Sequence, residues 1–192
     1  MIRPAVPDDA QAVVPLIFDA IGDIAYWLTG TAAPEEALTA MAGWFRRGGN
    51  RLGYEQIRVA EAEGRVAGMS LAYPGGRGPE LDRPLLERLH GQASSAPAAF
   101  VKEAEDDEFY LDSLAVASSE RGKGLGTALI RDFEAEAARK GFRKASLLVS
   151  EDKPRAEALY RSLGYEREGE RLILGAVYAH MVKRLDSSDE CR

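Results

Sequence analysis

The chain has 192 residues, with 25 Lys and Arg against 31 Asp and Glu, so its formal net charge is −6 at pH 7. Hydrophobic residues make up 45% of the sequence and charged residues 29%, which is typical of one ordinary globular domain with a core of its own. The acidic balance argues against nucleic acid as the main partner, because neutralising phosphates requires a basic surface.

The cysteine content and the N-terminus indicate the cellular compartment. Cys191 is the single cysteine, so no disulfide forms within the chain, and this suits a reducing compartment. The first residues lack the apolar stretch of a secretory signal, and no run of the sequence is long enough to span a bilayer. We therefore expect a cytoplasmic protein without a membrane partner.

The first part of the chain predicts alternating helices and strands. Asp8 and Asp9 are good caps for a helix with apolar residues on one face, and Pro34 fits the first turn of a second helix. A tight turn at Glu63-Gly64 predicts a hairpin. The expected elements are a strand over 1–6, helices ending at 21 and over 34–45, and strands over 57–62 and 65–73.

The composition changes over residues 74–108. We expect a Gly- and Pro-rich loop over 74–79, a short helix over 83–90 and a small, polar stretch over 91–99. The strands on either side are expected to be neighbours in one sheet, so we interpret 74–108 as an insertion within a single domain of residues 1–185. The polar tail, 186–192, is expected to be disordered.

The remaining part of the chain predicts a βαβ unit followed by a helix and a hairpin. A strand over 109–117, a helix ending at Lys140 and a strand over 145–150 have the lengths of a crossover connection, so these two strands should be parallel. Gly141 and Gly164 are suitable helix ends. The last elements are a helix over 154–163 and strands over 165–174 and 176–185.

The segment Arg121-Gly122-Lys123-Gly124-Leu125-Gly126-Thr127 joins an expected strand to an expected helix. Glycines let a ligand approach the backbone, and the first N–H groups of a helix have no partner within it, so this position favours an anion. A plain glycine-rich connector is the alternative. No Gly-Lys pair precedes Ser or Thr, which excludes a Walker loop, and the third glycine comes too early for the dinucleotide-binding pattern.

Two motifs resemble the signatures of the GNAT superfamily of N-acetyltransferases. The first is Arg or Gln, two residues, Gly, one residue, then Gly or Ala, which Arg121, Gly124 and Gly126 satisfy. The second is Ala-x-x-Leu-Tyr-x-x-Leu-Gly-Phe/Tyr, which residues 156–165 match. The two motifs in this order form a specific signal. The resemblance is clear over 109–165, extends over 1–185 by element order, and is absent over 74–108.

The resemblance implies an α/β (α+β) fold, in which a single-domain GNAT-like mixed, twisted sheet has splayed parallel central strands and flanking helices. It also implies acetyl-CoA as the acyl-donor cosubstrate, bound in the splay between strands 109–117 and 145–150. The first strand would pair with the pantetheine arm, and the glycine-rich loop would hold the pyrophosphate. The implied cofactor-binding residues are Leu114, Ala115, Val116, Arg121, Gly122, Lys123, Gly124, Leu125, Gly126 and Thr127.

Acyl transfer from a thioester to an amine requires loss of a proton from the amine and protonation of the leaving thiolate. Tyr160 has the helical spacing of a core aromatic, but the resemblance assigns it as the general acid at the CoA sulfur. On the strand, Tyr110, Asp112, Leu114 and Val116 share one face by two-residue periodicity. Asp112 is the candidate base, and a structural polar residue is the equal alternative.

The implied function is transfer of an acetyl group from acetyl-CoA directly to a primary amine, without a covalent enzyme intermediate. The sequence has no nucleophile elbow, and Cys191 lies in the tail. Lys153 replaces the Asn that the family usually places before the second motif's helix. A non-catalytic acyl-CoA-binding regulator is therefore one alternative. A kinase-like nucleotide-binding enzyme is another, and the missing Gly-Lys-Ser/Thr pattern disfavours it.

The acceptor side carries weaker signals. An acidic run, which would attract a cationic amine if it bordered the cleft, contains Glu103, Glu105, Asp106, Asp107 and Glu108. The first two helices and the 74–108 insertion are the expected walls of the acceptor site. His90 and His180 are isolated in the sequence, so we expect no metal. A homodimer is possible, and the sequence does not decide the oligomeric state.

Overall fold

The computed structural model describes residues 1–92 and 97–185. The expected disordered tail, 186–192, and Cys191 within it lie outside the described residues. The strands are β1 (Ile2–Pro4), β2 (Ile57–Ala62), β3 (Arg65–Pro74), β4 (Phe109–Val116), β5 (Lys144–Ser150), β6 (Glu166–Ile173) and β7 (Ala176–Arg184). The α-helices are α1 (Ala10–Ile21), α2 (Ile24–Thr29), α3 (Pro34–Arg47), α4 (Gly78–Gln92), α5 (Leu125–Arg139) and α6 (Pro154–Ser162).

The seven strands form one mixed sheet in the order β1-β2-β3-β4-β5-β7-β6. β4 and β5 run parallel, whereas the other neighbouring strands are antiparallel. β4 and β5 pair only from Phe109↔Ala145 to Leu111↔Leu147, although β4 continues to Val116 and β5 to Ser150. The prediction of a mixed sheet with splayed parallel central strands is confirmed.

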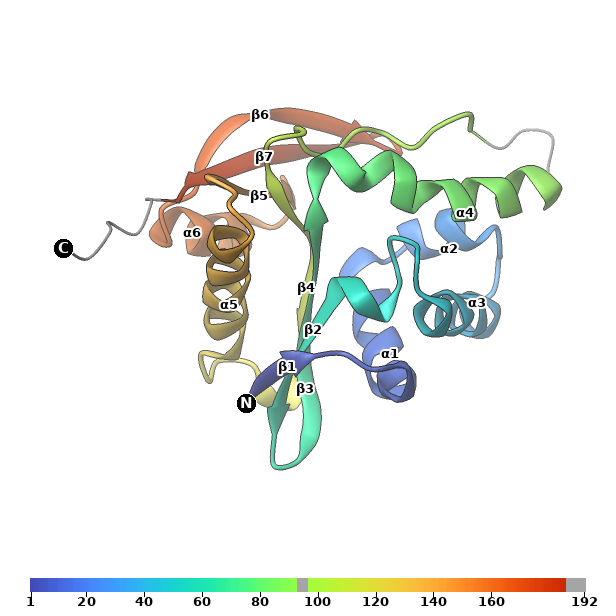
Figure 1. The fold of residues 1–192 in the computed structure, drawn as a ribbon, viewed down its shortest axis with the longest axis horizontal. Helices are drawn as coiled ribbons and strands as arrows, with labels where there is room; N and C mark the ends of the chain where they lie inside the picture. The colour runs from blue at the N-terminus through green and yellow to red at the C-terminus, as the bar shows by residue number, and fades with distance from the viewer. Residues whose placement is uncertain (93–96, 186–192) are drawn as a thin grey trace.

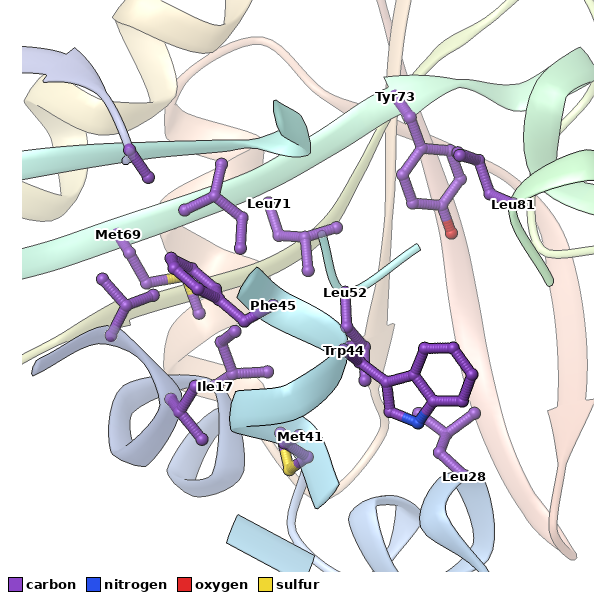
Figure 2. Close-up of a cluster of buried hydrophobic side chains, with 14 of the residues drawn as sticks. Ile17, Leu28, Met41, Trp44, Phe45, Leu52, Met69, Leu71, Tyr73 and Leu81 are labelled. Atoms are coloured by element: carbon purple, nitrogen blue, oxygen red, sulfur yellow. The ribbon is translucent and has the colours of Figure 1, made fainter. Parts of the chain in front are cut away.

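Helices cover both faces of the sheet. Figure 1 shows α5 and α6 on one face and α1, α2, α3 and α4 on the other. In the core of the second face, Ile17 of α1 and Phe45 of α3 meet Met69 and Leu71 of β3, and all four are fully buried (Figure 2). The α5 face has its own core, in which Phe133 stacks on Phe109 with ring centroids 5.4 Å apart. The two cores fix the sheet between the helical layers.

The 74–108 segment is an insertion between two neighbouring strands, as expected, because Tyr73 of β3 pairs with Tyr110 of β4. The prediction of a short helix over 83–90 and a loop over 74–79 was wrong in extent. β3 continues through Pro74, and α4 already starts at Gly78. Pro79 is compatible with a first helical turn, because the first N–H groups of a helix need no partner there.

A β-bulge in β4 corrects the predicted face of this strand. Ser113 pairs with Leu71 and Leu111 with Ala72, so Asp112 is the extra residue of the bulge. Tyr110 packs in the core on the α1 side, whereas Leu114 packs against the α5 core. The prediction that Tyr110 and Leu114 share one face was therefore wrong, because the bulge interrupts the two-residue period.

None of the helices in residues 1–92 and 97–185 has the length and apolar character needed to cross a bilayer.

Candidate active site

The splay opens one edge of β4. The N–H of Ala117 donates to Ala67 on the β3 side, and alternate residues of a strand direct their backbone groups to opposite edges. The backbone groups of Leu114 and Val116 therefore point toward the opening. Arg121 Nε donates to the Val116 carbonyl over 3.1 Å, so Arg121 ties the end of the strand to the loop that follows.

The loop after β4 ends in the N-terminus of α5, with Gly124 as the N-cap residue. Gly122 and Gly124 have φ values of 77° and 82°, which glycine adopts without strain, and a Cβ placed on either would meet no atom within 4 Å. The first α-helical hydrogen bond runs from Ala128 to Gly124. The preceding N–H groups at the helix start, over 125–127, are thus available to an anion beside open space.

The two basic residues of this loop are both exposed at the surface. Lys123 Nζ lies 3.1 Å from Glu120, so part of its charge is balanced in this structure. Leu125, Gly126 and Thr127 are partly buried where α5 begins, and Gly126 lies within 3.8 Å of Val116 when a Cβ is placed on it. The predicted loop residues therefore gather at one corner, between the end of β4 and the start of α5.

A cavity of about 470 Å³ connects the splay to the helices of the opposite layer. Leu114 and Val149 line it on the two splayed strands, and Tyr160 and Lys153 line it from α6 and its N-cap. Trp27 of α2 and Phe100 of the insertion form the far wall, with ring centroids 4.5 Å apart. The expected acceptor walls thus do border the same cavity as the splay.

Tyr160 lies in α6, and its ring is in edge contact with Tyr165 at a centroid distance of 6.0 Å. Its side chain lines the cavity, and no residue of the described ranges forms a hydrogen bond to its hydroxyl within the structure. Burial raises the pKa of Tyr160 to about 12, so the phenol keeps its proton at neutral pH. The side chain is a proton donor that faces the cavity.

Asp112 lines the same cavity and accepts three hydrogen bonds. Its donors are Arg51 at 2.5 Å, the Tyr73 hydroxyl at 2.6 Å and the Ser113 hydroxyl at 2.9 Å. The side chain of Asp112 is 9% exposed. The predicted base is therefore part of a nearly buried polar cluster, and its carboxylate is well satisfied.

Arg51 is the centre of this cluster. Its guanidinium lies 2.8 Å from Glu103 and 3.2 Å from Asp82, in addition to its contact with Asp112. Burial disfavours the guanidinium charge, but the surrounding carboxylates outweigh burial and raise the pKa of Arg51 above its ordinary value. Glu103 also accepts a 2.5 Å hydrogen bond from the Tyr110 hydroxyl. Three acidic side chains thus share one buried cation.

Only one member of the acidic run faces the cavity. Glu103 lines it, whereas Glu105 pairs with Arg171 at 2.8 Å and Asp107 with Lys144 at 2.7 Å at the surface. Glu108 is buried with His180, whose Nε2 lies 3.0 Å from its carboxylate. The run therefore divides into surface ion pairs, one buried pair and one group at the cavity wall.

The two histidines have protein partners. His180 contacts Glu108, and His90 Nε2 lies 3.0 Å from the Pro97 carbonyl oxygen. Within the described part of the chain, no three His, Cys, Asp or Glu side chains are grouped as metal ligands would be.

Sequence reasoning missed Arg51, Tyr73 and Asp82. Each comes from a different region, namely the loop after α3, the end of β3 and the insertion. No local spacing joins residues that are so far apart in the chain, and only the pairing of β3 with β4 brings them together. A buried arginine within an apolar stretch has no composition signal of its own.

Known proteins share this architecture. A family model described as the Acetyltransferase (GNAT) family matches residues 19–165. A solved structure described as an acetyltransferase is 31% identical in sequence, with 97% of this chain and 100% of that chain covered and a TM-score of 0.80. No curated protein sequence matches the chain.

More distant structures share the fold alone. An N-acetyltransferase from Staphylococcus aureus Mu50 is 24% identical, with 95% of this chain and 99% of that chain covered and a TM-score of 0.79. The PaiA N-acetyltransferase from Thermoplasma acidophilum, solved in complex with coenzyme A, is 12% identical, with coverages of 96% and 98% and a TM-score of 0.60. Since the family model spans well over half of its length, this chain belongs to the GNAT acetyltransferase family.

Proposed function

We propose that this protein transfers an acetyl group from acetyl-CoA directly to a primary amine, without a covalent enzyme intermediate. The observation that carries the proposal is the single cavity that joins the splayed strands to the Arg51 carboxylate cluster, with Tyr160 on its wall. A donor that enters from the loop side and an acceptor that enters from the helical side would meet in it.

The residues around the splay fit an extended, phosphate-bearing ligand. The backbone of Leu114 and Val116 faces the opening, and the N–H groups over 125–127 face open space beside Gly122 and Gly124. Bound acetyl-CoA would supply the thioester whose acetyl group is transferred. Its pantetheine arm would lie along β4, and its pyrophosphate would lie at the α5 N-terminus, with Arg121 and Lys123 nearby. Coenzyme A in the PaiA complex supports this assignment.

Tyr160 is the proposed general acid. Its phenol stays protonated at neutral pH, because burial raises its pKa to about 12. In that state the hydroxyl can donate its proton to a thiolate that forms beside it. Lys153, at the N-cap of α6, also lines the cavity but is exposed, and we assign it at most a contact with the cofactor.

Asp112 is the proposed base, which removes the ammonium proton of the acceptor directly or through a water molecule. It belongs to the bulge of β4, immediately before Ser113 and Leu114, and all three line the cavity. Glu103 adds negative charge to the acceptor side of the same wall. An excess of carboxylates over cations there favours a positively charged acceptor such as an amine.

The test is a turnover assay over chemically distinct primary amines. Purified protein would be mixed with acetyl-CoA and, in turn, spermidine, tyramine, ribostamycin and a peptide with a free N-terminal alanine. Released CoA thiol is measured, and the product is checked by mass spectrometry for one added acetyl group. We expect amine-dependent thiol release with at least one acceptor class.

Two alternatives give different results. A regulatory acyl-CoA-binding protein would bind acetyl-CoA in a calorimeter but would release no thiol with any amine. A nucleotide-binding enzyme would be stabilised against heat by ATP and not by acetyl-CoA. Either pattern would contradict the proposed function.

A further inference from the structure

The 74–108 insertion supplies two of the three carboxylates around Arg51. Asp82 belongs to α4, and Glu103 lies in the segment between α4 and β4. Their oxygens lie 3.2 Å and 2.8 Å from the guanidinium that also contacts Asp112. The insertion thus contacts the proposed base through a single shared arginine.

We propose that Asp82 is a positioning residue for Asp112, which acts through Arg51 and keeps Asp112 able to accept a proton from the acceptor amine. This inference rests on the proposed function, because it concerns the base of that reaction. In the step itself, an N–H bond of the acceptor ammonium breaks, an O–H bond forms on Asp112, and the nitrogen keeps the electron pair with which it attacks the thioester.

The reason is the charge balance of the cluster. A carboxylate paired alone with one arginine is strongly stabilised in its ionised form, and it is then a poor proton acceptor. Here one guanidinium faces three carboxylates, so the cluster carries a net charge of about −2 when all are ionised. Asp82 competes for the positive charge of Arg51, and its own negative charge favours protonation of Asp112.

Burial makes this competition strong. The side chains of Arg51, Asp82 and Asp112 are 7%, 12% and 9% exposed. Charges so poorly solvated interact over several ångströms with much less screening than at the surface. Burial, together with the nearby carboxylates, raises the pKa of Asp82 to about 6 despite the opposing effect of Arg51, so Asp82 itself feels the excess negative charge.

Other ionisable groups face the cluster from each surrounding element. Tyr73 of β3 donates to Asp112, and Tyr110 of β4 donates to Glu103. The remaining ionisable side chains that line the two cavities beside the cluster are Asp19, Arg83, Glu87, His90, Lys102, Lys153, Tyr160 and Tyr178. None of these side chains forms an ion pair with Arg51 in the described structure, whereas Asp82 does.

The test measures the proton affinity of Asp112 directly. Carboxyl carbons of the free, ¹³C-labelled protein are followed by NMR as the pH is changed, in the wild type and in the Asp82→Asn variant. Removing the charge of Asp82 should lower the titration midpoint of Asp112 by roughly one pH unit. Asp82→Glu restores the charge and should return the midpoint toward the wild-type value.

The control is Asp132→Asn, which removes a partly buried carboxylate from its pair with Arg58 between α5 and β2. It should leave the Asp112 midpoint unchanged. If Asp82→Asn does not fold, Glu103→Gln removes another charge from Arg51 and carries the same prediction. An Asp112 midpoint that is the same in the wild type and in the folded Asp82 or Glu103 variant would overturn the proposal.

The titration needs no acceptor, so it separates this proposal from the proposed function. If no amine is acetylated but the Asp112 midpoint falls in Asp82→Asn, the coupling stands and the assigned reaction fails. If an amine is acetylated, the pH profile of kcat should shift to lower pH in Asp82→Asn by the same amount as the NMR midpoint. A shifted NMR midpoint with an unshifted kcat profile would contradict the assignment of Asp112 as the base.

Discussion

Leu111 and Leu147 form the last pair of the parallel ladder between β4 and β5, and beyond them both strands continue without pairing to each other. The bulge residue Asp112 follows directly after this last pair. The place where the sheet opens is therefore also where an acidic side chain reaches the cavity. Donor binding on the strand edge and proton removal from the acceptor are thus assigned to adjacent residues of one strand.

The loop glycines give the first prediction. Gly124→Asp places a negative side chain in the open space before the α5 N-terminus, at a φ of 82° that non-glycine residues rarely adopt. We expect acetyl-CoA binding to be lost, because the new carboxylate repels the pyrophosphate and occupies its space. Isothermal titration calorimetry measures the loss, and circular dichroism checks the fold.

A matched control exists after the other end of α5. Gly141 has a φ of 84°, and a Cβ placed on it would also meet no atom within 4 Å. Gly141→Asp therefore introduces the same charge and similar backbone strain away from the loop. It should bind acetyl-CoA like the wild type, and equal loss of binding in both variants would show that backbone strain, and not the loop site, is responsible.

The candidate base gives the second prediction. Asp112→Asn should lower kcat about 100-fold and leave acetyl-CoA affinity nearly intact, because it removes a proton acceptor but keeps the shape of the side chain. Asp132→Asn, which changes a carboxylate paired with Arg58 elsewhere in the fold, should keep wild-type kcat. If kcat is the same in Asp112→Asn and the wild type, Asp112 has only a structural role.

Direct transfer gives the third prediction. Cys191 is the only cysteine in the sequence, so a thiol-linked acetyl intermediate could form nowhere else on the chain. The Cys191→Ala variant should have unchanged turnover. Protein incubated with labelled acetyl-CoA in the absence of an acceptor should carry no label on Cys191, and a labelled cysteine would instead indicate a two-step route through the enzyme.

The buried Glu108–His180 pair gives a prediction about stability. Burial opposes ionisation of Glu108, but hydrogen bonds from His180 and from the Glu105 N–H outweigh it and lower its pKa from 4.5 to about 2. Because the pKa is lower in the folded state, ionised Glu108 stabilises the fold fully above its unfolded value. This contribution is lost as the pH falls from 4.5 toward 2.

Urea unfolding of the wild type and Glu108→Gln at several pH values tests this sign. The variant should be less stable near neutral pH, and the difference should shrink as the pH falls below the ordinary glutamate pKa. Asp107→Asn is the control, because Asp107 is exposed and pairs with Lys144 at the surface. A stability difference that stays constant down to the acid transition would contradict the assigned role of the pair.

The sequence predicted the part of the molecule that depends on local pattern. The glycines at 122 and 124, the helix after them and Tyr160 in α6 lie within one βαβα stretch, where spacing along the chain determines spacing in the fold. The order of strands around 109–117 and 145–150 was predicted as well. These elements are short-range, and their turn and helix-end residues are specific.

The acceptor side depends on contacts between distant segments, and these were not predictable from spacing. Arg51 meets Asp82, Glu103 and Asp112 only because the insertion folds back beside β3 and β4. The bulge at Asp112 was missed because a single extra residue leaves the composition of a strand unchanged while it reverses the faces beyond it. Helix α2 was missed because its six residues are too few for a clear period.

The central claim is that acetyl-CoA reacts in the cavity at the splay, with Tyr160 protonating its sulfur, and Tyr160→Phe tests it most directly. The change keeps the ring and its contact with Tyr165, so the stability should fall by no more than about 1 kcal/mol. Tyr165→Phe is the matched control, because Tyr165 is buried in the same core but does not line the cavity.

The measurement is kcat, taken with the melting temperature and the acetyl-CoA affinity on the same preparations. We predict that Tyr160→Phe lowers kcat about 10- to 100-fold while fold and affinity stay close to the wild type, and that Tyr165→Phe keeps wild-type kcat. A Tyr160→Phe enzyme with native stability and wild-type kcat would contradict the account, because the thiolate would then leave without a proton from Tyr160.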